Sequence, residues 1–95
     1  MEQFDFEARR DEVSRGIAVS GLINEPIIKE TVDGILHSCQ NQWLYELDPI
    51  KREILWQQTQ GVVLFIQTLK GVVDTGKMAA AQLEMEKAIN RDQES

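Results

Sequence analysis

Few side chains in this sequence have a type and spacing that could carry out chemistry. His37 is the only histidine and Cys39 the only cysteine, and they are two residues apart in a stretch with a helical pattern. Side chains two positions apart on a helix diverge, because neighbouring positions are three or four apart. A zinc site needs three or four protein ligands. We therefore expect no metal site, a solvated His37 and a buried, structural Cys39.

Catalytic patterns are also lacking. The carboxylates lie mostly on polar faces or in the terminal segments, whereas paired acids for hydrolysis flank a cleft. A nucleophile triad needs a histidine with a partner motif, and His37 has none. The stretch from Gly71 to Met78 partly resembles a phosphate-binding loop, but it lacks the Ser or Thr and follows a helical pattern rather than a strand. We expect no enzyme activity and no cofactor.

Charge and composition exclude several classes of partner. Sixteen acids outnumber ten scattered bases, giving a net charge of −6, whereas a nucleic-acid binder needs a basic patch. The longest apolar run, Val62 to Ile66, is much shorter than the roughly 20 residues of a membrane span. The acidic N-terminus lacks a signal-peptide pattern, and one unpaired cysteine is typical of a reducing compartment. The expected protein is cytoplasmic, without direct nucleic-acid or membrane contact.

The elements that must position these residues are helices. Two prolines divide the chain, with Asn24 expected to cap the helix that begins at Pro26 and Asp48 the helix that begins at Pro49. Short connections favour an antiparallel arrangement. We predict a single all-α domain, residues 1–95, with frayed ends and three helices at about 5–22, 26–47 and 49–90.

The third predicted helix is long and has one apolar sector. Its period continues across Gly71 and Gly76, which predicts one helix, straight or bent between those glycines, rather than two. At 1.5 Å per residue it would span roughly 60 Å, about twice the second helix. The apolar sector consists of Ile50, Ile54, Leu55, Val62, Phe65, Ile66, Leu69, Val72, Val73, Ala80 and Leu83.

The length of the third predicted helix indicates a contact surface. If the first two helices fold back, they cover the N-terminal half of the third, and its C-terminal stripe has no partner in the chain. Either the helix breaks and folds back or another chain covers the stripe, and we favour another chain. The residues expected to mediate self-association are Leu69, Val72, Val73, Ala80 and Leu83.

A second set of apolar residues lies outside this sector. Trp56, Val63 and Leu64 either pack against the first helix or form a second contact surface with another molecule. Two glycines in or near the main sector, Gly61 and Gly76, are expected to let a neighbouring helix approach closely.

Three stretches of the chain resemble small helical proteins of tailed bacteriophages, which are encoded among head, packaging and tail genes. They are Asp48 to Trp56, Val62 to Leu69 and Val73 to Gly76, followed by a step through Ala79 to Leu83. The resemblance extends over roughly Ile17 to Leu83 and implies a role in a virion or its assembly. It implies no site residues, and the acidic balance does not match packaging subunits that contact DNA.

Two functions follow as hypotheses. The first is a non-enzymatic, homo-oligomeric helical protein that acts in the structure or assembly of a macromolecular complex, phage or bacterial. The alternative is a small acidic monomeric regulator that occludes a basic surface of a host or phage enzyme, with its net charge of −6 steering the encounter.

Overall fold

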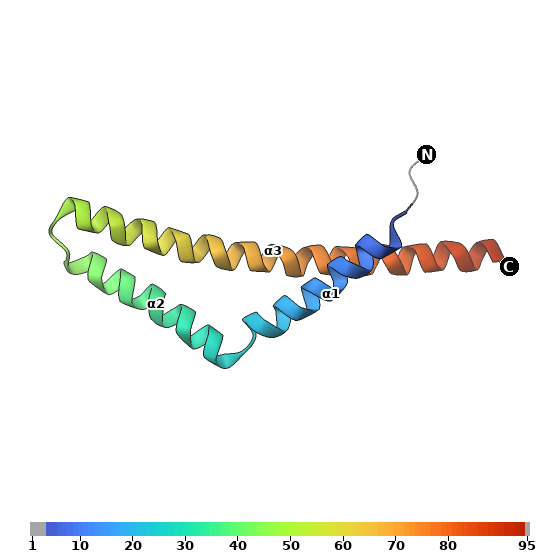
Figure 1. Ribbon diagram of the computed structural model, residues 1–95, viewed down its shortest axis with the longest axis horizontal. Helices are drawn as coiled ribbons and strands as arrows, with labels where there is room; N and C mark the ends of the chain where they lie inside the picture. Colours follow the sequence, from blue (N-terminus) through green and yellow to red (C-terminus); the bar gives the residue numbers. More distant parts are fainter. Residues whose placement is uncertain (1–3, 95) are drawn as a thin grey trace. The chain divides into compact units, whose positions relative to one another are not determined.

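The computed structural model describes residues 4–94, and within that range it contains three α-helices and no strand (Figure 1). Helix α1 spans Phe6–Ile23, α2 spans Pro26–Tyr45 and α3 spans Pro49–Glu94. The predicted all-α class is confirmed. No helix in the described range is both long and apolar enough to cross a membrane.

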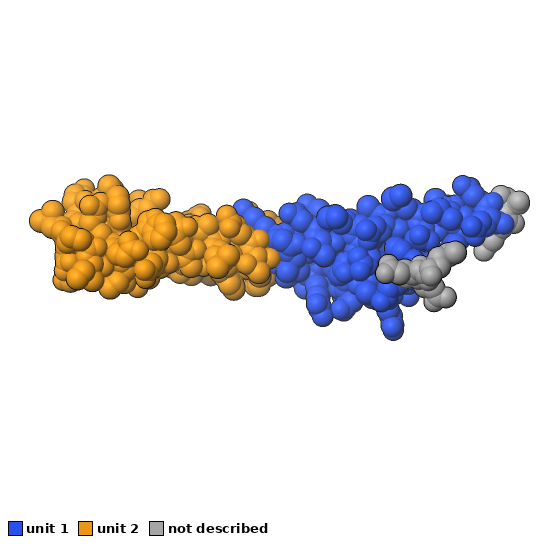
Figure 2. Space-filling model, turned by 90° about the horizontal axis from the view of Figure 1, so that it is seen from above, with its two compact units in different colours: residues 1–21, 70–95 blue, residues 22–69 orange. Residues whose placement is uncertain are grey.

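The chain forms two compact units (Figure 2). Unit 1 consists of residues 1–21 and 70–95, so it pairs most of α1 with the C-terminal half of α3. Unit 2 consists of residues 22–69 and pairs α2 with the N-terminal half of α3. Each unit is therefore essentially a pair of helices.

Side-chain caps define the starts of α1 and α3. Asp48 Oδ1 accepts a hydrogen bond from the backbone N–H of Ile50 at 2.9 Å, and Pro49 occupies the first helical position. Asp5 Oδ1 accepts in the same way from the N–H of Ala8 at 2.9 Å. The predicted cap by Asp48 is confirmed.

The start of α2 differs from the prediction. Glu25, not Asn24, is its N-cap residue, and the Glu25 side chain makes no capping hydrogen bond. The N-cap thus lies one residue later than expected, and the Glu25 N–H donates to the carbonyl of Leu22 at 3.2 Å. Pro26 lacks a backbone N–H, so the first helical position needs no acceptor there.

The ends of α2 and α3 also differ from the expected bounds. Helix α2 ends at Tyr45 rather than at Leu47, because Glu46 has an extended backbone and its carboxylate accepts a hydrogen bond from the Asp48 N–H at 3.1 Å. Helix α3 continues to Glu94 and remains helical through Gly71 and Gly76.

Unit 1 is built around two glycines, Gly16 of α1 and Gly76 of α3, both buried. A Cβ atom on Gly16 would lie 3.0 Å from the Gly76 Cα, and one on Gly76 would lie 2.9 Å from the carbonyl oxygen of Glu12. The two helices therefore contact each other backbone to backbone. Ala79, three residues after Gly76, is completely buried. The predicted close approach of a neighbouring helix is confirmed at Gly76, whereas a Cβ atom on Gly61 would meet nothing within 4 Å in this chain.

Unit 2 has few buried side chains between α2 and α3. Cys39 of α2 is 8% exposed, as expected of a structural cysteine. Among residues 4–93, Cys39 and Ala79 are the only buried residues other than Gly16 and Gly76. Most large apolar side chains of both units thus remain partly or largely in contact with solvent.

Candidate interaction surfaces

Of the residues predicted to mediate self-association, Val72, Val73 and Ala80 lie where α3 contacts α1 in unit 1. All five (Leu69, Val72, Val73, Ala80 and Leu83) are half-buried. A Cβ atom on Gly16 would lie 3.3 Å from the carbonyl oxygen of Val72. The expectation that this stripe lacks a partner within the chain is therefore wrong, because the absence of side chains at Gly16 and Gly76 lets α1 pack directly on it.

This stripe is not completely covered. Val73 and Ala80 line a groove of about 220 Å³ together with Val13 and Ile17 of α1. Self-association through these residues stays a prediction.

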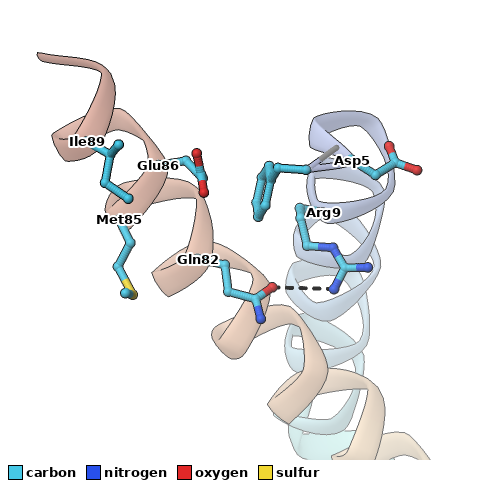
Figure 3. Close-up of a pocket in the computed structure, with 7 residues that line it drawn as sticks. Asp5, Arg9, Gln82, Met85, Glu86 and Ile89 are labelled. Atoms are coloured by element: carbon cyan, nitrogen blue, oxygen red, sulfur yellow. Dashed lines mark hydrogen bonds between the residues drawn. The ribbon is translucent and has the colours of Figure 1, made fainter. Parts of the chain in front are cut away.

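The two helices of unit 1 also meet through polar side chains near their ends. Arg9 Nη1 donates a hydrogen bond to Gln82 Oε1 at 3.3 Å, and Figure 3 shows the two side chains pointing toward each other. Arg9 also pairs with Glu12 on its own helix at 3.1 Å. Arg9 thus connects α1 to α3 at one end of their contact. Beside it, the side chains of Met85 and Ile89 line an open hollow.

Trp56, from the second predicted surface, lies beside α2. It is 51% exposed and lines a groove of about 450 Å³ with Trp43, Leu44 and Gln40. Of the other two predicted residues, Leu64 is exposed and Val63 is half-buried. Trp56 therefore belongs to the pairing of α2 with α3.

Trp43 also stacks against a cation. The guanidinium carbon of Arg52 lies 3.9 Å from the centroid of the Trp43 ring, an arrangement that favours Arg through its planar charge. The Arg52 Nε is buried and has no hydrogen-bond partner. Arg52 and Trp43 join the start of α3 to the end of α2.

The opposite side of α3 in unit 2 is apolar and uncovered. Its large side chains are Ile50, Ile54, Leu64 and Phe65, with exposed fractions of 73%, 49%, 64% and 62%. The prediction that the fold covers the N-terminal half of the apolar sector is wrong at Ile50, Ile54 and Phe65. Helix α2 contacts the other side of α3, the side that carries Arg52 and Thr59.

This part of the chain also lacks charge. No residue from Ile54 to Leu69 carries a formal charge, although the whole chain has a net charge of −6. Large apolar side chains, a run of glutamines and no lysine or carboxylate make up the surface of α3 here. Depletion of charge with enrichment of apolar and aromatic groups is typical of the central part of protein–protein interfaces.

The residues considered for chemistry all lie within helices, His37 and Cys39 in α2 and the stretch from Gly71 to Met78 in α3. His37 is exposed, and its Nε2 lies 3.1 Å from the Asn41 amide one turn later. Among the residues the structure describes, no three His, Cys, Asp or Glu side chains are grouped so as to hold a metal ion. The stretch from Gly71 to Met78 is helical, so its amides do not form a phosphate-binding loop.

Two contacts in the structure, at Gly16 and between Arg52 and Trp43, are not predicted by the sequence. Ser20 follows Gly16 by four residues as Ala80 follows Gly76, and this spacing of small residues is a signal that could have indicated a close contact at Gly16. The stacking of Arg52 on Trp43 has no local signal, because it depends on the turn between α2 and α3.

Comparisons with known proteins found no match: no family model fits the chain, and no curated protein or solved structure shows significant similarity to it.

Proposed function

We propose that this chain is a non-enzymatic helical protein that acts in the structure or assembly of a larger complex through self-association and protein–protein contacts. The observation that carries the proposal is the scarcity of buried apolar side chains in the described range beside many exposed ones. Small domains with too little core commonly gain stability by oligomerisation. A second chain would cover the exposed residues and supply the missing burial.

The proposed assembly unit is an antiparallel three-helix arrangement that is completed by other chains. In unit 1, Arg9 of α1 contacts Gln82 of α3. Gly16, later in α1, contacts Gly76, earlier in α3. This order supports opposite helix directions. The stripe of Leu69, Val72, Val73, Ala80 and Leu83 and the surface of Trp56, Val63 and Leu64 are the proposed contact residues.

The resemblance to small phage proteins supports a virion or its assembly pathway, in the host cytoplasm, as the setting. The net charge of −6 and the scattered bases support protein partners rather than nucleic acid. The same charge favours the alternative of an acidic monomer that binds a basic surface, which would show salt-sensitive binding to one partner.

A substitution in the stripe tests the proposal. Leu69→Asp places a charge on a half-buried position that we expect to contact another chain. The expected result is a lower mass in sedimentation equilibrium with the helical circular-dichroism signal retained. If the wild-type protein is a monomer and Leu69→Asp unfolds, Leu69 is ordinary core and the proposal fails.

A further inference from the structure

The uncovered side of α3 in unit 2 has a regular pattern. Ile50, Ile54, Gly61 and Phe65 are separated by four, seven and four residues, which places them on one face of a helix. Leu64 lies beside Phe65 on the same side. We call these five residues the α3 face, and all five are exposed.

The α3 face is separate from the contact with α2. Arg52 stacks on Trp43, and Thr59 lines the groove beside Gln40 and Leu44, so α2 lies on the side of α3 that carries positions 52 and 59. Residues two apart on a helix point about 200° apart. The α3 face around Ile50 and Ile54 is therefore turned away from α2.

We propose that the α3 face binds the same face of a second copy, so that two chains associate through the N-terminal halves of their α3 helices. This inference rests on the proposed function, which requires self-association. It assigns the dimer contact to the α3 face, a surface distinct from the stripe of Leu69, Val72, Val73, Ala80 and Leu83, which is left for contacts beyond the dimer. Three observations support a second copy as the occupant: charge, area and a glycine.

The charge pattern favours a copy over a basic partner. Two copies each carry −6 and repel one another, so they approach with least repulsion where each surface is uncharged. The stretch from Ile54 to Leu69 is such a surface. A basic partner would instead be attracted to segments rich in acids, and the α3 face offers it no carboxylate.

The area is sufficient for a modest dimer. The four large side chains of the α3 face are about half or more exposed, which leaves on the order of 400 Å² of apolar surface per chain at roughly 100 Å² each. Homodimer interfaces are about 65% apolar, so a contact of about 600 Å² per chain follows. Two chains together would bury roughly 1,200 Å², at the lower end of the range for stable complexes.

Gly61, at the middle of the α3 face, makes no close helix contact among the described residues. A Cβ atom there would meet nothing within 4 Å, whereas a Cβ on Gly16 or Gly76 would collide with the opposing helix. Glycine inside a helix lowers its stability relative to alanine. A second α3 crossing at Gly61 would use the missing side chain as unit 1 uses Gly16 and Gly76.

The first test compares two substitutions of equally exposed residues on α3. Phe65→Glu changes the α3 face, and Met78→Glu changes a residue outside it that is 65% exposed. Sedimentation equilibrium should show wild type and Met78→Glu as dimers at concentrations where Phe65→Glu is a monomer. Because Phe65 is exposed, the circular-dichroism signal of the monomer should still be helical.

The second test replaces glycine by alanine, which has a higher helix propensity and so does not weaken α3 itself. Gly61→Ala should weaken dimerisation about tenfold or more, since overpacking of a tight contact has that effect. Gly34→Ala in α2, where a Cβ also meets nothing within 4 Å, should leave it unchanged.

The outcomes separate this inference from the proposed function. If wild type is a dimer and Phe65→Glu and Gly61→Ala dimerise as tightly as their controls, the chains associate through another surface and only the α3 face is excluded. If wild type remains monomeric at all concentrations, both the inference and the proposed self-association are wrong.

Discussion

Gly16 of α1 and Gly76 of α3 approach so closely that a Cβ atom on either would lie 3.0 Å from the Cα of the other. Real Cβ atoms rarely come this close to a backbone atom of another helix, and the backbone cannot yield as a flexible side chain can. The pairing of α1 with α3 in unit 1 therefore depends on glycine at both positions.

Alanine at Gly76 should lower the free energy of unfolding by about 1–3 kcal/mol, because the added methyl group meets the Glu12 carbonyl and the Gly16 backbone. Gly71→Ala is the control in the same helix, where a Cβ meets nothing within 4 Å. It should stabilise the protein by about 1 kcal/mol through helix propensity. Urea denaturation followed by circular dichroism measures both, and equal stability of the two variants would contradict the contact.

A larger side chain at Ala79 should also destabilise unit 1. Ala79 is completely buried, so Ala79→Leu forces α1 and α3 apart at a cost of about 1–3 kcal/mol. Ala81 is exposed, and Ala81→Leu should change stability by less than about 0.5 kcal/mol. Thermal unfolding distinguishes the two, and an Ala79→Leu variant as stable as wild type would show that the helices do not pack at this position.

Removal of the cap at the start of α3 should weaken that helix. Asp48→Ala loses the hydrogen bond to the Ile50 N–H and should cost about 1 kcal/mol. Asp48→Asn keeps a side-chain oxygen at the same position and should retain most of the stability. Denaturation midpoints of the two variants measure this. If Asp48→Asn loses as much stability as Asp48→Ala, the Asp48 side chain does not act as a cap.

The stack of Arg52 on Trp43 can be followed by fluorescence. In a Trp56→Phe background Trp43 is the only tryptophan, so its emission reports directly on the Arg52 contact. Arg52→Ala should shift that emission to longer wavelength by exposing the ring, and should lower stability by about 0.5–1 kcal/mol. Lys51→Ala removes the neighbouring charge and should leave the emission unchanged, whereas a shift of the same size in both variants would argue against stacking.

The all-α class could be predicted from the sequence because its signals are local. Apolar residues recur at helical spacing, and the proline at position 49 follows a capping Asp48. The choice of partners for each helix is not local. The apolar sector of α3 indicates a buried side but not which helix covers which part of it, so the sequence predicted the wrong part to be uncovered.

Glycine explains this error in physical terms. Gly16 lowers the helix propensity of α1, and the sequence alone treats that as a weakness. In the structure the same missing side chain lets α1 pack on Gly76. By contrast, Ile50 and Phe65 have the apolar character of core residues but remain exposed, because α2 lies on another side of α3.

The mass of the wild-type protein in solution tests self-association most directly. Light scattering on a size-exclusion column, over a tenfold range of concentration, would measure it. A defined multiple of the 10.9 kDa chain mass that persists on dilution is the predicted result. A single mass of 10.9 kDa at every concentration would contradict self-association and leave the exposed apolar side chains of α3 without their proposed partner.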